Sequence, residues 1–165
     1  MTPAAIARRR LRTQGIGGGR FGSAEEVVGW LGAVQAQEYA VAKWSIGQRS
    51  AGVDEAAVDR ALERGGLLRT HVLRPTWHFV LPRDIRWMLA VTAPRVRGMM
   101  ASYDRKLELD DALYARTNDI IGRTVEGGRH RTRRELAEAL AGAGIQASGQ
   151  RLGHIVLRAE LDALV

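Results

Sequence analysis

The pattern of apolar and polar positions predicts four helices in the first 66 residues. A short basic helix is expected over residues 3–13, and a glycine-rich loop follows it. The next helix should begin at Ser23, because Ser23 and Glu26 form a capping box. Its apolar face is made of residues three and four positions apart: Val27, Trp30, Leu31 and Val34. Two more helices are expected over residues 39–48 and 54–65.

The apolar period changes near residue 67, where a β-hairpin is predicted. Residues 67–73 and 76–81 have the composition of strands, with a turn at Arg74-Pro75 between them. The second strand has three large apolar side chains on one face: Trp77, Phe79 and Leu81. Helices followed by a hairpin are typical of a winged-helix unit.

After the hairpin the spacing becomes helical again. Three helices are expected over residues 82–89, 94–107 and 111–123. Pro94 would lie in a first turn, where its missing N–H does no harm.

Residues 126–165 have the spacing of a helix-turn-helix. Thr132 and Glu135 form a capping box for the first helix, and Ser148 is placed to cap the second. The buried side of the second helix is expected to contain Leu152, Ile155, Val156 and Ala159. The opposite side should carry Arg151, His154 and Arg158. No wing follows, so this second unit is expected to be truncated.

These elements predict a mainly α fold with short β-hairpins, that is, an α+β fold of tandem winged-helix or helix-turn-helix units. Residues 1–90 should form the first winged-helix unit and residues 91–125 a helical connector. Residues 126–165 should form the second unit, without its wing. At 165 residues the chain is long enough to bury a real core.

Several classes of protein are excluded. No run of about 18 apolar residues exists, so neither a transmembrane helix nor a membrane partner is expected. The first residues lack the apolar stretch of a secretory signal. Because the chain has no cysteine, disulfides and thiolate zinc sites are impossible. A cytoplasmic protein is expected, associated with the nucleoid if it binds DNA.

The charge points to a polyanionic partner. Lys and Arg number 25 against 18 Asp and Glu, which gives a net charge of +7, and only Lys43 and Lys106 are lysines. Arginine suits phosphates and guanine edges, which favours double-stranded DNA. The simpler alternative is a GC-rich coding sequence, which raises Arg, Ala and Gly together.

The histidines and glycines give no sign of a metal or cofactor site. The four histidines lack the close spacing of zinc ligands. His71 and His78 are expected on neighbouring strands, where an ordinary strand pair is the preferred interpretation. Residues 15–19 are glycine-rich but precede no dinucleotide-binding unit, so a flexible connector is expected there. We therefore expect no cofactor.

The segment 123–134 is strongly basic and lies at the start of a predicted helix. It contains five arginines and one histidine against one glutamate. Helix N-termini and arginines both suit phosphates. A solvated basic loop explains the pattern equally well.

The most distinctive local feature is the pair Gln35 and Gln37, at the junction of two predicted helices. If the backbone there is not helical, both amides can point the same way and hold one water. Glutamines two residues apart are more often ordinary surface or capping residues.

The residues around this pair strengthen the functional interpretation over the ordinary one. The run from Leu31 to Ala40, followed by Arg69-Thr70-His71 and Arg74-Pro75-Thr76-Trp77-His78-Phe79-Val80, resembles the winged-helix family that includes the AlkZ-type DNA glycosylases. The resemblance covers most of residues 5–165. It implies tandem winged helices that excise alkylated bases or unhook interstrand crosslinks, with Gln35 and Gln37 serving the catalytic step. Members of that family are about twice as long as this chain.

The implied function is a DNA glycosylase in which the two glutamines orient water. Under this hypothesis, Glu38 is an alternative water activator, and Trp77 packs rather than wedging into DNA. The expected DNA contacts are Arg74, His78, Arg131, Arg133, Arg134 and Arg151.

Two other functions stay open. The first is a non-catalytic winged-helix DNA-binding regulator, because fold alone does not assign chemistry. The second is a truncated, inactive relative that self-associates through the surface left by a missing C-terminal part.

Overall fold

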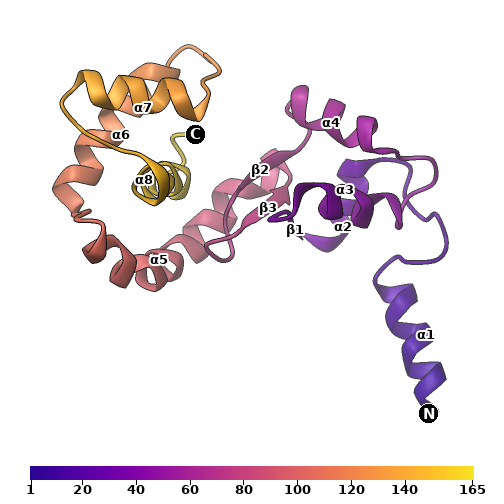
Figure 1. Cartoon of the computed structure of the whole chain (residues 1–165). Coiled ribbons are helices and arrows are strands. Elements are labelled where there is room, and N and C mark those ends of the chain that lie inside the picture. The colour runs from indigo at the N-terminus through magenta and orange to yellow at the C-terminus, as the bar shows by residue number, and fades with distance from the viewer. The chain divides into compact units, whose positions relative to one another are not determined.

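The computed structural model describes all residues from Met1 to Val165, and it is an α+β fold (Figure 1). It has eight helices and one small sheet, and this mainly α, α+β class is the one that the sequence predicted. In chain order the elements are α1 (Pro3–Thr13), α2 (Ala24–Leu31), β1 (Val34–Gln35), α3 (Tyr39–Gly47), α4 (Glu55–Glu63), β2 (Leu68–His71), β3 (Trp77–Val80), α5 (Pro82–Lys106), α6 (Asp111–Val125), α7 (Arg133–Gly142) and α8 (Gly149–Leu161).

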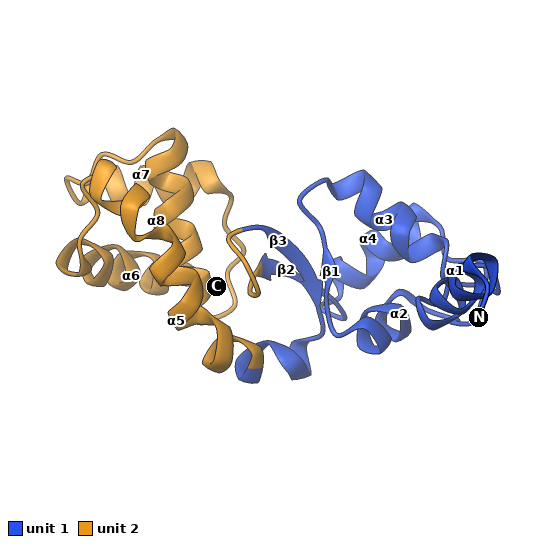
Figure 2. Cartoon of the chain, turned by 90° about the horizontal axis from the view of Figure 1, so that it is seen from below, with its two compact units in different colours: residues 1–70, 76–87 blue, residues 71–75, 88–165 orange.

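The chain forms two compact units (Figure 2). Unit 1 contains residues 1–70 and 76–87, and unit 2 contains residues 71–75 and 88–165. The residues expected to form a connector, 91–125, belong to unit 2, where α6 packs against α7 and α8.

Unit 1 is built on a three-stranded sheet of order β1-β3-β2. Its core contains large side chains that are fully buried, among them Val27, Ile46, Val58, Leu67 and Phe79. The predicted caps are present: the Ser23 Oγ accepts from the Glu26 N–H at 3.2 Å, and the Asp54 carboxylate from the Ala57 N–H at 2.8 Å. These caps satisfy amides that have no partner within the helix.

Strand β1 was not predicted. The sequence pattern assigned Val34 to the apolar face of a helix, but α2 ends at Leu31 and is followed by Gly32, whose φ is +78°. Glycine adopts this left-handed conformation readily and ends the helix. Val34 then pairs with Phe79, and Gln35 with His78, in an antiparallel register. Two residues are too short a strand for an alternating pattern to reveal.

The helix break expected before Pro94 is wrong. Helix α5 runs without interruption from Pro82 to Lys106, with Pro94 inside it. The proline removes one helical hydrogen bond, to the carbonyl of Ala90. Both residues are exposed, so water satisfies that carbonyl. None of the helices is long and apolar enough to span a bilayer.

Unit 2 has its own core, formed by α6, α7 and α8. Its most deeply buried side chains are Ile121, Leu140 and Ile155. The Thr132–Glu135 capping box is complete, because each side chain accepts from the other residue's backbone N–H. Ser148 lies at the N-cap of α8, as expected, but its hydroxyl makes no capping bond.

Candidate functional site

Gln35 and Gln37 lie on the same side of an extended segment. Both are exposed, while Val34 before them and Ala36 between them are buried. Side chains two positions apart in an extended chain share a face. The structure therefore has the non-helical backbone that lets the two amides point the same way.

The segment is tied to strand β3 at two points. The Ala36 N–H donates to the Trp77 carbonyl at 2.7 Å. The Trp77 N–H donates to the Gln37 Oε1 at 3.3 Å. Because a backbone N–H bonds only to the oxygen of an amide, this contact fixes which way the Gln37 side chain is turned.

His78 lies directly across the sheet from Gln35 and shares its face. Its side chain is buried, with the residue only 4% exposed, and its Nδ1 lies 2.8 Å from the Thr76 carbonyl. A carbonyl only accepts, so Nδ1 carries the proton of this bond. His78 is thus a buried neighbour of Gln35, and the prediction that it contacts DNA remains untested.

Arg69, for which the sequence predicted no role, contacts the same segment. Its Nε and Nη2 both donate to the Ala36 carbonyl, at 3.1 and 2.9 Å. Its guanidinium carbon lies 4.5 Å from the Trp77 ring centroid and 5.3 Å from that of Tyr39. The position of Arg69 on a predicted strand, two residues before His71, does not reveal its contact with the Ala36 carbonyl.

A polar cluster holds Tyr39 in place. The Tyr39 hydroxyl donates to Asp59, which also accepts from Lys43 Nζ at 3.0 Å. The hydrogen bonds from Tyr39 and Lys43 hold the pKa of Asp59 below its usual value. Burial and Asp59 raise the pKa of Tyr39. The phenol therefore stays neutral and donates to the carboxylate.

Three of the arginines expected to contact DNA gather at the start of α7: Arg131, Arg133 and Arg134. All three are exposed, and the Arg134 side chain keeps 85% of its surface accessible although it lies 3.7 Å from Glu138. Arg131 contacts Glu135 and the Thr124 carbonyl. Arg74, also exposed, lies in the turn between β2 and β3. These four arginines have surface to offer a phosphate.

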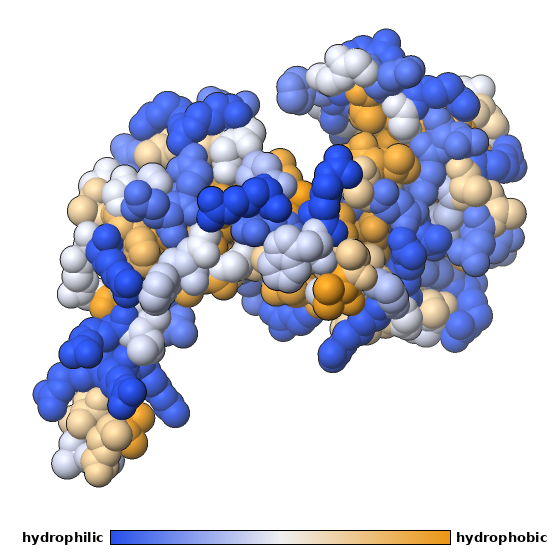
Figure 3. Space-filling model, turned by 180° about the vertical axis from the view of Figure 1, so that it is seen from behind, coloured by the Kyte–Doolittle hydropathy of each residue, from blue (hydrophilic) through white to orange (hydrophobic).

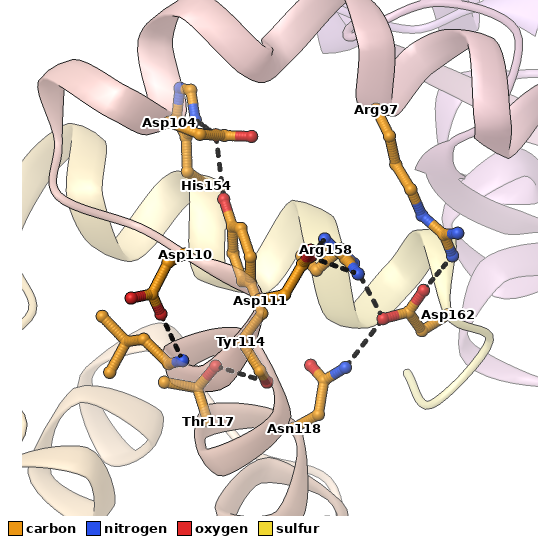
Figure 4. A network of polar contacts seen from close by, with 11 residues as sticks. Arg97, Asp104, Asp110, Asp111, Tyr114, Thr117, Asn118, His154, Arg158 and Asp162 are labelled. Atoms are coloured by element: carbon orange, nitrogen blue, oxygen red, sulfur yellow. Dashed lines mark hydrogen bonds and ion pairs between the residues drawn. The ribbon is translucent and has the colours of Figure 1, made fainter.

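The expected basic outer face of α8 does not exist. The Arg151 Nη1 donates to the Leu107 carbonyl and lies 4.0 Å from Glu108. His154 pairs with Asp104 at 2.8 Å, and Arg158 pairs with Asp111 and Asp162 (Figure 4). Arg151 thus makes internal contacts in unit 2, and the prediction that it contacts DNA remains untested.

Two carboxylates of this network, Asp162 and Asp104, each accept from more than one donor. Asp162 accepts from Arg97, from the Asn118 amide at 2.8 Å and from the Arg158 Nε at 3.0 Å (Figure 4). Asp104 accepts from Tyr114 as well as from His154, and burial with this carboxylate raises the pKa of Tyr114. These contacts bind α5, α6 and α8 together.

Helix α1 is a further basic element, to which the sequence analysis assigned no partner. None of its residues is buried, and Figure 3 shows it at the lower left, covered largely by hydrophilic side chains. Its arginines are Arg8, Arg9, Arg10 and Arg12. No acidic residue precedes Glu25 in the chain. The signal that reveals this surface, a run of arginines without acidic residues, is visible in the sequence.

Comparison with known proteins identifies the family. The family model described as "DNA glycosylase AlkZ-like" matches residues 28–164. The chain belongs to the AlkZ-like DNA glycosylase family. The AlkZ-like match includes the whole segment of Gln35 and Gln37 and the β-hairpin that supports it. No curated protein sequence matches the chain.

A solved structure shows the same fold. It is DNA glycosylase AlkZ from Streptomyces sahachiroi, with a TM-score of 0.77 and 22% sequence identity. The match covers 94% of this AlkZ-like chain and 43% of that protein. The chain therefore spans less than half the length of the AlkZ structure that it resembles.

Proposed function

We propose that this chain is a DNA glycosylase that hydrolyses the N-glycosidic bond of alkylated or crosslinked purines in double-stranded DNA. The observation that carries the proposal is the pair Gln35 and Gln37, both exposed on a segment in which Val34 and Ala36 are buried. Membership of the AlkZ-like family supports it.

The chemistry needs little more than a well-placed water. A purine alkylated at N7 or N3 is cationic, so it leaves without strong acid catalysis. The remaining task is to orient a water toward the sugar and to stabilise the positive charge that develops on it. Neutral amide oxygens do both when they are fixed in advance. The Trp77 N–H fixes the Gln37 amide through one acceptor position of its oxygen, and the second lone pair is the one proposed to accept from the water.

The surface supports DNA as the partner. The element order α2-β1-α3-α4-β2-β3, with its three-stranded sheet, supports the proposal that unit 1 is a winged helix. The exposed arginines Arg74, Arg131, Arg133 and Arg134 are the proposed phosphate contacts. Phosphate contacts of this kind position a protein on DNA without reading sequence.

The test is single-turnover excision of N7-alkylguanine from a labelled duplex. We expect the wild type to release the base, and the variant Gln35→Ala/Gln37→Ala to bind the duplex equally well without releasing it. The matched control is Gln146→Ala/Gln150→Ala, which removes two exposed amides elsewhere in the chain. Normal excision by the Gln35/Gln37 variant would refute the catalytic assignment.

A second candidate is a DNA-binding protein without glycosylase activity. It is favoured by the basic surface at the start of α7, which does not depend on the glutamine pair. This function predicts a preferred DNA sequence, equal affinity for intact and alkylated duplexes, and no base release. A competition titration with both kinds of duplex separates it from the glycosylase.

A further inference from the structure

The antiparallel pairing of β1 with β3 is altered at the residue between the two glutamines. Continued one step from the pair Gln35 and His78, the register places Ala36 opposite Trp77. A hydrogen-bonded antiparallel pair exchanges two backbone bonds. The Ala36 N–H does donate to the Trp77 carbonyl, at 2.7 Å. The reciprocal bond is replaced, because the Trp77 N–H donates to the Gln37 side chain.

Arg69 takes the place of the missing donor. Its Nε and Nη2 both donate to the Ala36 carbonyl, at 3.1 and 2.9 Å. The carbonyl therefore keeps hydrogen-bond donors while the Trp77 N–H bonds to the Gln37 Oε1 at 3.3 Å. Arg69 thus bonds to the Ala36 backbone carbonyl, and the Trp77 N–H bonds to the Gln37 amide and orients it.

The guanidinium is itself held from both sides. It stacks near the rings of Trp77 and Tyr39, whose centroids lie 4.5 and 5.3 Å from its central carbon. Tyr39 is fixed by its bond to Asp59, and its ring meets the buried Phe79 ring edge-on, with centroids 5.9 Å apart. A planar, forked cation is required here, since an ammonium has neither the fork nor the flat face.

We propose that Arg69 is a positioning residue for the glutamine pair, and that it acts by occupying the Ala36 carbonyl so that the Trp77 N–H orients the Gln37 amide. The inference rests on the proposed function for its catalytic consequence, but its geometry stands independently of any activity. Arg69 acts in this proposal through the backbone of the segment, by its bonds to the Ala36 carbonyl.

The kinetic test compares Arg69→Lys and Arg69→Met with the wild type in single-turnover excision. We expect both variants to lose about 100-fold in rate, since small displacements of a positioning group have effects of that size. Duplex affinity should change less than twofold. The control is Arg86→Lys, an exposed arginine of unit 1 on helix α5. Wild-type excision by Arg69→Lys would overturn the proposal.

Double variants separate positioning from general support. In a Gln37→Ala background, Arg69→Lys should cause almost no further loss, because the amide that it orients is gone. In a Gln35→Ala background it should still reduce any residual rate. A residue that merely stabilises unit 1 would lower the rate by the same factor in both backgrounds, and that result would contradict the proposal.

A measurement without catalysis tests the geometry. In ¹⁵N-labelled protein, the Gln37 side-chain amide should give two well-dispersed NMR signals close in space to the Trp77 N–H. We expect these signals to collapse toward ordinary glutamine positions in Arg69→Lys while the Gln146 signals stay unchanged. If the wild type releases no base, the proposed function fails, and this spectrum alone decides the positioning role. Unchanged Gln37 signals in Arg69→Lys would refute it.

Discussion

The basic residues at the start of α7 and those of α8 have the same sequence signature and different structural fates. Arg133 and Arg134 are exposed at the first turn of a helix. Arg151 and Arg158 lie on a helix that packs against α6, and each of them contacts acidic groups or carbonyls of unit 2. The same basic pattern therefore accompanies exposed arginines at the start of α7 and internally bonded arginines on α8.

The physical reason lies in the length of arginine. Its aliphatic part packs along apolar surface while its guanidinium reaches polar groups at the edge of a core. On α8 the neighbouring helices supply those polar groups, among them Asp111, Asp162 and the Leu107 carbonyl. At the start of α7 the nearest carboxylates, Glu135 and Glu138, are one helical turn away on the surface. Such exposed pairs contribute little energy.

If α8 is a structural helix, its buried pair should have the largest effect. The Glu160 carboxylate accepts from the His71 backbone N–H at 2.9 Å and lies 2.7 Å from the His71 Nδ1. Removing one partner of a buried pair costs about 3–5 kcal/mol. Glu160→Ala should lose that amount in urea unfolding, whereas the exposed Glu138→Ala should stay within about 0.5 kcal/mol. Equal free energies of unfolding for the Glu160→Ala and Glu138→Ala variants would contradict a structural role for α8.

Arg151→Met sharpens the comparison at a residue first expected to contact DNA. Methionine keeps the apolar part of the side chain but leaves the Leu107 carbonyl without its donor. The expected loss of stability is about 1–3 kcal/mol, the cost of an unsatisfied buried acceptor. Duplex affinity, measured at salt concentrations where the variant is folded, should equal that of the wild type. A clear loss of affinity would restore Arg151 as a DNA contact.

Arg133→Gln/Arg134→Gln is the converse experiment. If these arginines bind phosphates, the slope of log K against log salt should become shallower by about 0.9 for each of them. The melting temperature should not change, because both side chains are exposed. Fluorescence anisotropy of a labelled duplex over a series of salt concentrations measures the slope. An unchanged slope would assign phosphate binding to another surface, with α1 the first to test.

The smallest expected effect on stability comes from removing the N-cap of α7, the helix on which Arg133 and Arg134 lie. Thr132→Ala should destabilise unit 2 by about 1 kcal/mol, since it removes the N-cap bond of α7. Hydrogen bonds from Thr132 lower the pKa of Glu135, so the carboxylate's contribution is present above the ordinary glutamate pKa of about 4.3. It is lost as the pH falls through the lowered pKa. The variant keeps the backbone N–H that is the main cause of the lowered pKa and loses only the hydroxyl bond to Glu135, so acidification should narrow the difference between the two melting temperatures without closing it.

Local signals in the sequence predicted the helices with capping residues well. Ser23, Asp54 and Thr132 each accept from the third residue of the helix that they precede. The hairpin at residues 67–81 was also correct, because its two runs of strand-forming residues flank a proline turn. Short strands and long helices were less predictable. Strand β1 spans two residues, and Pro94 is tolerated inside α5 because its surroundings are exposed.

The sequence by itself determined the α+β class, most element boundaries and the position of Gln35 and Gln37 at the junction of two helices, because caps and turns depend on neighbours along the chain. Only the tertiary structure decided that both amides share a face, that Arg69 takes the Ala36 carbonyl, and that Arg151 is an internal contact. Each of those outcomes depends on which polar group lies opposite a side chain. Residues 33 and 44 positions apart meet there, and spacing along the chain carries no record of such meetings.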